Sequence, residues 1–252
     1  MNDRHPTFPP LLSGHELTTG NDPFVYACAD AAKGAVGAGE LFWSKERESL
    51  RFALVLEPDV PRARCGEMVY AAMVAFGDAA GALIPPEVAI TYQWPNVIQM
   101  NNGQIGSVDL QVSQNEESEE PAWMVLGLNA RLMPDFADMN PGENYHVTTF
   151  WDEGCGNITR TGLLESVARH LVNAIHTWSE GGFKPIHRQW LSRLNSNAQL
   201  SPELARPDTK FVGLDELGSG LLSVGGEMIS RSVVDVLDTT WRTPAPQTVG
   251  DQ

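Results

Sequence analysis

The sequence predicts a protein of mixed α and β structure that is built around a sheet. Three β signals lie close together in residues 88–112, and apolar residues recur at helical spacing in residues 62–80 and 163–178. Short β runs broken by glycines follow in residues 210–237. Segments of these kinds favour a sheet that is covered by helices and followed by a small β unit.

The first β segment gives the clearest prediction. Residues 88–94 are rich in β-branched and aromatic side chains, and Pro95 ends this run because proline has no N–H for a strand ladder. Asn102 and Gly103 then favour a type I′ hairpin turn, in which both central residues have positive φ. Gly106 lies inside the second arm, where a glycine often marks a bulge or the close approach of a ligand.

Capping residues and periodicity predict the helices. Asp22 is expected to cap a helix over residues 24–33, with a proline at its first position. A second helix is expected over residues 62–80. A third is expected to begin after Thr159, with a further helical piece at residues 183–194 beyond a Gly-Gly pair.

The remaining segments are expected to form strands and connections. Buried or half-buried strands are predicted at residues 51–56, 122–130 and 146–151. Residues 134–144 are expected to form a loop. Residues 1–22 are rich in Pro, Gly and Thr, which is typical of an extended arm.

Composition excludes some classes of function. The 252 residues carry a formal net charge of −15 with a pI near 4.7, which argues against nucleic acid because phosphate binding depends on Lys and Arg. No run approaches the ~20 apolar residues of a membrane helix, and the N-terminus has no signal-peptide core. Three cysteines, Cys28, Cys65 and Cys155, without framework spacing favour reduced thiols in a cytoplasmic protein. The six histidines show no metal-ligand spacing.

Several motifs occur in the order seen in one known family. Residues 94–96 (W-P-N) followed by residues 103–106 (G-Q-I-G) are similar to the biotin protein ligase signature K-W-P-N-D, spacer, G-x-K-I-G-G. Residues 125–129 resemble the G-I-G-I-N strand of that family, residues 163–190 its helix, and residues 211–215 the opening of its C-terminal domain. The chain therefore resembles the biotin/lipoate A/B protein ligase superfamily.

The resemblance implies a fold and a domain plan. The fold is α+β, with a mixed, mostly antiparallel sheet flanked by helices, as in class II synthetases and biotin ligases. We expect a ligase-like catalytic domain at residues 1–204, with residues 1–22 as its extended arm. A small SH3-like β domain is expected at residues 205–240, followed by a disordered tail at residues 241–252.

The resemblance also implies a chemistry. Members of the family activate a carboxylic acid with ATP to form an acyl-adenylate, and then pass the acyl group to a lysine of a carrier domain. The implied cofactors are ATP and biotin or lipoate. The implied partners are a small acyl or biotin-like ligand and a biotinyl or lipoyl carrier domain, with no nucleic acid and no membrane.

This chain departs from the family at its cationic positions. The lysine of G-x-K-I-G is Gln104 here, the lysine before W-P-N is Gln93, and the aspartate after it is Val97. Residues 34–39 keep the glycines of the family's Arg- and Gly-rich loop, and Trp43 fits its tryptophan, but no arginine is present. A neutral amide cannot stabilise a phosphate as an ammonium does, so we expect a divergent member without standard ATP-dependent ligation.

The expected ligand pocket uses the positions that the family motif retains. Its candidate residues are Trp43, Trp94, Asn96, Gly106 and Asn129, with Gln104 in place of the lysine. The alternative is that the tryptophans are core residues and Asn96 a turn residue, because pockets and cores use the same residue types. Arg51, Arg131 and Lys45 are candidates to replace the lost charge.

Cys155 is the candidate nucleophile. It lies in a Gly-Cys-Gly turn, in a place similar to the Pro-Cys-Gly turn of the octanoyltransferase branch, which transfers an acyl group through a thioester. A helix beginning near Thr159 is expected to lower the pKa of the thiol. The alternative is a structural cysteine in a turn. Two classes thus remain: an enzyme, either a divergent ligase or a Cys155-dependent acyltransferase, and a catalytically inactive descendant that binds a ligand or carrier.

Overall fold

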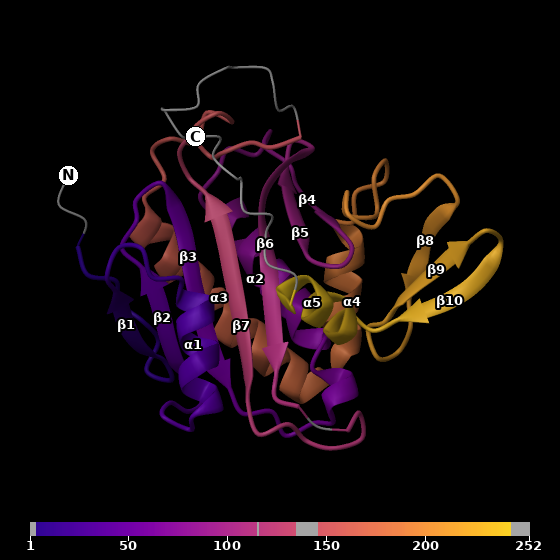
Figure 1. Cartoon of the computed structure of the whole chain (residues 1–252). Coiled ribbons are helices and arrows are strands. Elements are labelled where there is room, and N and C mark those ends of the chain that lie inside the picture. Colours follow the sequence, from indigo (N-terminus) through magenta and orange to yellow (C-terminus); the bar gives the residue numbers. More distant parts are fainter. Residues whose placement is uncertain (1–3, 115, 135–145, 243–252) are drawn as a thin grey trace, which may run out of the picture.

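A seven-stranded sheet in the order β1-β2-β3-β7-β6-β5-β4 forms the centre of the molecule in a computed structural model (Figure 1). The structure describes residues 4–114, 116–134 and 146–242. Strands β1 and β2 are parallel, and every other neighbouring pair in this sheet is antiparallel. The α+β class with a mixed, mostly antiparallel sheet is therefore confirmed. The strands are β1 (Ser13–Leu17), β2 (Glu40–Ser44), β3 (Ser49–Leu56), β4 (Ile90–Gln93), β5 (Val97–Met100), β6 (Gly103–Val112) and β7 (Met124–Arg131).

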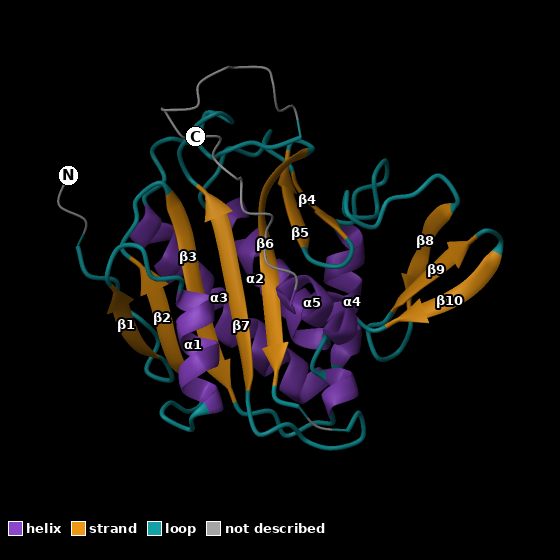
Figure 2. Ribbon diagram, viewed as in Figure 1, coloured by secondary structure: helices purple, strands orange, loops and turns teal. Residues whose placement is uncertain are grey.

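Helices lie on both faces of this sheet (Figure 2). The back face is covered by α2 (Glu67–Gly81) and α3 (Arg160–Gly181), and α4 (Phe183–Ser192) packs against both. The front face carries α1 (Pro23–Ala32) over β3 and β7, and α5 (Val233–Arg242) beside β6. A short 3₁₀ helix at Arg62–Arg64 precedes α2. Within the described ranges, no helix combines the length and apolar character that crossing a bilayer requires.

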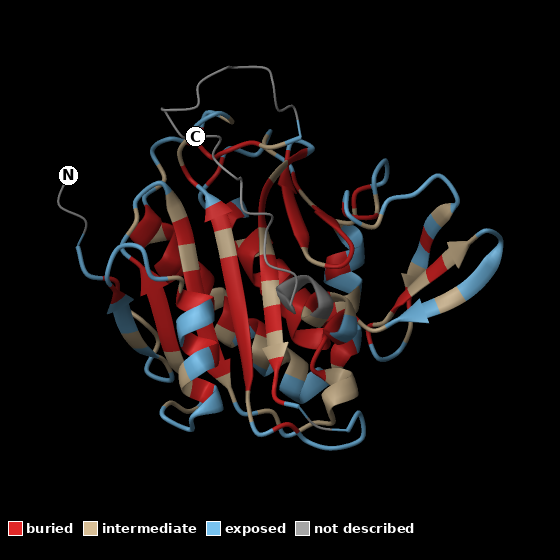
Figure 3. Ribbon diagram, in the orientation of Figure 1, coloured by how far each residue is buried: buried red, intermediate tan, exposed pale blue. Residues whose placement is uncertain are grey.

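The main core lies between the sheet and the back helices (Figure 3). Alternate residues of each strand face it, such as Leu50, Phe52 and Leu54 of β3. Helix α2 is buried along most of its length because the sheet lies on one side and other helices lie on the other. A second, smaller core forms where α1 covers Ala53 and Val55 on the front face.

The predicted hairpin forms with its turn one residue earlier than expected. Asn101 and Asn102 have φ values of 47° and 73°, and Met100 pairs with Gly103. Asparagine tolerates this left-handed region, so the turn does not need the glycine. The predicted bulge is confirmed, because the β5–β6 register shifts at residues 98–99 and leaves Ile105 as the additional residue.

Capping residues identified both helix starts correctly. The Asp22 carboxylate accepts the N–H groups of Phe24 and Val25, and the Thr159 hydroxyl accepts that of Gly162 at 3.1 Å. The expected extended arm instead contains β1, whose pairing partner β2 lies 27 positions further along the chain. Such distant pairing leaves no local signal in a five-residue strand.

The strand predicted at residues 146–151 was wrong. This segment forms one isolated bridge, between Val147 and Gln104, and then turns. The Thr149 hydroxyl donates to Asp152 Oδ2 at 2.8 Å and accepts the N–H of Asp152 at 3.1 Å. These local bonds compete with a strand ladder. Most of the loop predicted at residues 134–144 lies outside the described residues.

A separate three-stranded antiparallel sheet follows the helices. Its strands are β8 (Thr209–Leu214), β9 (Gly220–Val224) and β10 (Glu227–Arg231), in the order β10-β9-β8. The chain then forms α5, which the β runs expected up to residue 237 did not predict. Gln111 Nε2 donates to Asp238 Oδ1 at 3.2 Å and joins α5 to β6. Residues 243–252 of the expected tail lie outside the described residues.

Candidate ligand-binding site

Rows of side chains cross the front face because paired residues of neighbouring strands point to the same side of a sheet. The first row is apolar on β3 and β7, where α1 covers it, and the next two rows add charged, amide and hydroxyl side chains. The rows on β3, β7 and β6 are Val55–Val125–Gln111, Ala53–Gly127–Asp109 and Arg51–Asn129–Ser107, with Ser49–Arg131 beyond them on β3 and β7. The polar rows therefore begin near the N-terminus of α1.

A cavity of about 290 Å³ opens over these polar rows. Its lining includes Asp22 before α1, Arg51 on β3, Asp109 on β6, and Asn129 and Arg131 on β7. The volume is at the lower end of the range for small-molecule sites. The cavity combines both signs of charge with an amide, and hence has the polar groups that can orient a small ligand.

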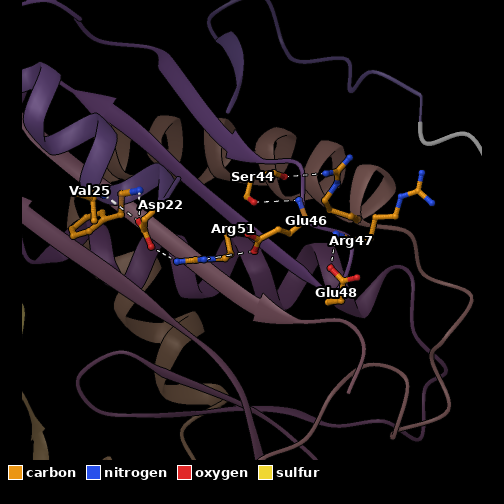
Figure 4. Close-up of polar contacts among 9 residues, drawn as sticks. Asp22, Val25, Ser44, Glu46, Arg47, Glu48 and Arg51 are labelled. Atoms are coloured by element: carbon orange, nitrogen blue, oxygen red, sulfur yellow. Dashed lines mark hydrogen bonds and ion pairs between the residues drawn. The ribbon is translucent and has the colours of Figure 1, made fainter. Parts of the chain in front are cut away.

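Asp22 and Arg51 line the cavity and contact each other (Figure 4). One carboxylate oxygen of Asp22 caps α1, and the other pairs with Arg51 Nη2. Arg51 Nη1 lies 3.7 Å from Glu46 Oε2 in the loop between β2 and β3. Ser44 Oγ accepts the N–H of Glu46 at 3.2 Å and helps to turn this loop. Two carboxylates thus offset the charge of Arg51 before any ligand binds.

Asp109 is the second carboxylate of the cavity. Burial, followed by the charge of Asp22, raises the pKa of Asp109 to about 6, against the opposing effects of a hydrogen bond from Asn129 and the charge of Arg51. Asn129 Nδ2 also donates to Ser107 Oγ at 2.8 Å. A Cβ at Gly127 would lie 2.6 Å from the Phe24 ring and 3.3 Å from Asp109 Cβ, so this glycine lets Phe24 of α1 pack closely onto β7 beside Asp109.

Arg131 lies at the end of β7 on the same face. Its Nη1 donates to the backbone oxygen of Gln104 at 3.3 Å, and desolvation lowers the pKa of its guanidinium. Arginine nevertheless stays charged at neutral pH. Of the three candidates for the lost charge, Arg51 and Arg131 line the cavity, whereas Lys45 Nζ lies 3.3 Å from Glu16 Oε1.

Gln104 lies beside the cavity and outside its lining. Its backbone N–H donates to His146 at 2.8 Å and its oxygen accepts from Thr148 at 3.0 Å. The residue therefore connects β6 to the segment that follows residue 145. Residues 34–39, which keep the glycines of the family's Arg-rich loop, do not line this cavity, and residues 34–37 border another hollow near His15 and Phe42.

The two predicted tryptophans lie in the back-face core. Trp43 is fully buried, with its ring 5.2 Å from that of His5 and 5.3 Å from that of Phe8. Trp94 is also fully buried, and its Nε1 donates to the Tyr70 hydroxyl at 3.0 Å. Neither lines the front cavity, which agrees with their interpretation as core residues.

The three other predicted pocket positions have different surroundings. Asn96 Nδ2 donates to the backbone oxygen of Val108 at 2.8 Å, so it braces the turn after β4. A Cβ at Gly106 would lie 2.0 Å from the backbone oxygen of Asn129. The close approach at Gly106 is thus made by β7. Asn129 lines the cavity, and its side chain contacts the polar groups there.

Cys155 is buried in the main core with 1% exposure. Its Sγ donates to the backbone oxygen of Glu153 at 3.6 Å. Burial, followed by the charges of Glu153 and Glu87, raises the pKa of the thiol. A nucleophilic cysteine needs a lowered pKa and access to substrate, and these surroundings supply neither. Neither Cys155 nor Gln104 nor Trp94 lines the front cavity or the three other main cavities of the described residues.

Sequence reasoning did not identify Asp109 or Ser107 as site residues. The alternation S-V-D-L-Q-V in β6 indicates which side chains share a face, but it does not say which face α1 covers.

Among the described residues, no group of three or more His, Cys, Asp and Glu has the geometry of a metal site.

The family model for the biotin/lipoate A/B protein ligase family matches residues 8–192. The chain belongs to this family. The match contains the whole front cavity and the seven strands of the main sheet.

Individual relatives of this family member support the same conclusion. A biotin–[acetyl-CoA-carboxylase] ligase of Paracoccus denitrificans is 25% identical over 186 residues, which is 71% of this chain and 76% of that protein. A crystal structure of a biotin protein ligase-like protein of unknown function from Silicibacter sp. has a TM-score of 0.82 and 34% identity. It covers 92% of this chain and 99% of that chain.

A biotin protein ligase from Aquifex aeolicus shares the fold. Its TM-score is 0.64 at 14% identity, with coverage of 88% of this chain and 96% of that chain. A further structure of a biotin protein ligase from that organism is a complex with biotin and ATP.

Proposed function

We propose that this family member binds a small carboxylic acid of the biotin or lipoyl/octanoyl type in the front cavity, and handles that group for attachment to a biotinyl or lipoyl carrier domain. The observation that carries the proposal is the grouping of Asn129, Arg51 and Arg131 over the open part of the sheet. The amide orients polar atoms of the ligand, and Arg131 meets its carboxylate at the end of β7.

The charges that line the described cavity do not suit a nucleoside triphosphate. Gln104 is neutral and lies outside the lining, and Asp22 and Glu46 already offset the charge of Arg51. Phosphoryl groups need concentrated positive charge. The cavity therefore supports binding and presentation of the acid better than an ATP-dependent step.

Because the cavity lacks the concentrated positive charge that phosphates need, a second candidate is a protein that binds the acid or its carrier without ligation. A Cys155-dependent acyltransferase is a weaker candidate, because burial and two nearby carboxylates oppose thiolate formation.

Calorimetric titration with biotin, lipoate and octanoate tests the binding step. We expect at least one acid to bind, and Asn129→Ala and Arg131→Ala each to weaken it roughly tenfold, about 1.4 kcal/mol. Arg231→Ala is the matched control, because this exposed arginine lies on β10 outside the cavity. The absence of binding by all three acids, or equal binding by Arg131→Ala, contradicts the proposal.

Intact-mass spectrometry separates ligation from binding. The chain is incubated with the bound acid, ATP, Mg²⁺ and a carrier domain, with Cys155→Ala in parallel. A mass increase on the carrier identifies a ligase. An acyl adduct on the wild-type chain that is missing from Cys155→Ala identifies the thioester route, and an unmodified carrier and chain identify the binding protein.

A further inference from the structure

We propose that the acid selected by the front cavity carries a basic nitrogen at the end opposite its carboxylate, and that Asp109 is the specificity-determining residue that binds this nitrogen. The inference rests on the proposed function, because it assumes that an acid occupies the cavity. It narrows that acid to a zwitterionic class, an ω-amino acid or a similar compound.

The first argument is the balance of charge in the cavity. Asp22 and Asp109 face it from α1 and β6, and Arg51 faces it from β3. Arg51 pairs with Asp22 and lies near Glu46, and Arg131, the other arginine of the lining, lies four residues along β7 from Gly127, the strand partner of Asp109. Among the described residues, the Asp109 carboxylate therefore has no ion pair of its own, although Arg51 and Arg131 lie in the same lining. A buried charge requires a partner of opposite sign. A cationic nitrogen of the ligand supplies this partner.

The second argument is the hydrogen bonding around Asp109. The Asn129 side chain donates a hydrogen bond to Asp109. Its Nδ2 also donates to Ser107 Oγ at 2.8 Å. An amide satisfies an oxygen lone pair but does not neutralise the carboxylate. An ammonium group offers three donors and a full charge, whereas a neutral ureido or thioether head leaves the negative charge in place.

The third argument is the position of the second charged end. Asp109 pairs with Gly127, and Arg131 lies four residues further along β7. At the rise of a strand this separation is roughly 13 Å. Residues 127, 129 and 131 share one face, so the two charged ends and Asn129 between them line one groove. An extended ligand with an amine at Asp109 and a carboxylate at Arg131 fits this arrangement.

The groups that face Asp109 allow its pH dependence to be stated. They are Asp22 before α1, Arg51 on β3 and Cys28 within α1. Burial raises the pKa of Cys28 to about 12, so this thiol stays neutral. Binding of the amine therefore requires the Asp109 carboxylate and weakens as pH falls through about 6.

A matched ligand pair tests the inference. Octanoate and 8-aminooctanoate differ by one amine, and each is titrated calorimetrically into the wild type and Asp109→Asn at pH 7.5 and pH 5. We expect the amine to strengthen binding at least tenfold at pH 7.5. This gain should be lost in Asp109→Asn and at pH 5. Asp59→Asn, which removes an exposed carboxylate away from the cavity, should keep the gain.

The outcomes distinguish this inference from the proposed function. Binding of octanoate with no gain from the amine overturns the inference and leaves the proposed function standing. Binding of the amino acid to Asp109→Asn with wild-type affinity overturns the role of Asp109. Failure of octanoate, 8-aminooctanoate, biotin and lipoate to bind overturns both. Circular dichroism of Asp109→Asn verifies that the variant is folded.

Discussion

Asp109 shows how a single residue acquires its properties from its neighbours. In β6 it is an ordinary polar residue on the alternating face, and a solvated aspartate has a pKa near 3.9. Phe24 packs beside it because Gly127 has no side chain, and burial is the largest cause that raises its pKa to about 6. The carboxylate is therefore costly to keep ionised in the folded protein, which is the usual condition of a group that serves a ligand.

Replacement of Asp109 by asparagine should stabilise the protein at alkaline pH. The native pKa lies above the unfolded value, so the native state holds its proton more tightly and stability falls as pH rises from about 4 to 6. A shift of about two units corresponds to about 2–3 kcal/mol. Asp109→Asn should therefore be more stable than the wild type by about 2 kcal/mol at pH 8 and by much less at pH 5.

Urea denaturation of both proteins at the two pH values measures this difference. An equal difference at pH 5 and pH 8 would show that Asp109 titrates normally. A destabilised variant at pH 8 would show that the carboxylate makes native contacts that an amide cannot replace.

At the scale of the element, α1 links folding to the site through one residue. Asp22 caps the helix with one oxygen and pairs with Arg51 through the other. The helix then covers the apolar rows of the sheet and ends the cavity at its own N-terminus. The capping signal in the sequence thus marks the edge of the site, although it was interpreted only as a helix start.

Two substitutions should separate the roles of Asp22. Asp22→Ala removes the cap and should cost about 1–2 kcal/mol of stability. Asp22→Asn keeps a capping oxygen and should stay within about 0.5 kcal/mol of the wild type, because asparagine caps about as well. Thermal and urea denaturation measure both. Equal losses in the two variants would instead assign the stability to the ion pair with Arg51.

At the scale of the whole molecule, the C-terminal sheet is joined to the main core by a buried polar chain. Trp94 Nε1 donates to the Tyr70 hydroxyl at 3.0 Å, and that hydroxyl donates to the Gly218 oxygen at 2.6 Å. The Trp94 ring lies 6.1 Å from Phe211 of β8. Trp94, expected in a ligand pocket, therefore holds the two sheets together.

Tyr70→Phe should loosen this junction. It leaves the Trp94 N–H and the Gly218 oxygen without this partner, at a cost of about 2 kcal/mol. We expect a lower urea midpoint and faster tryptic cleavage after Lys210, at the start of β8. Tyr26→Phe, at an exposed tyrosine of α1, is the control and should change neither the urea midpoint nor the cleavage rate. Unchanged cleavage in Tyr70→Phe would show that apolar packing alone holds the C-terminal sheet.

Features that depend on neighbouring residues or on ordered motifs can be predicted from the sequence alone. Asp22 and Thr159 begin helices, a two-residue turn joins β5 to β6, and a bulge lies beside Gly106, since each follows from local backbone chemistry. The order of the W-P-N and later motifs indicated the family, which the family match confirms.

The faces that these elements present depend instead on how the folded chain packs. A strand pattern assigns residues to two sides, but the packing of α1 and α2 decides which side is core and which is open. Trp43 and Trp94 thus lie on the back face, Asn129 lies on the front, and Cys155 is buried. The pairing of β1 with β2 and the charge balance at Asp109 also depend on residues distant in sequence, because both arise from contacts that form only when the chain is folded.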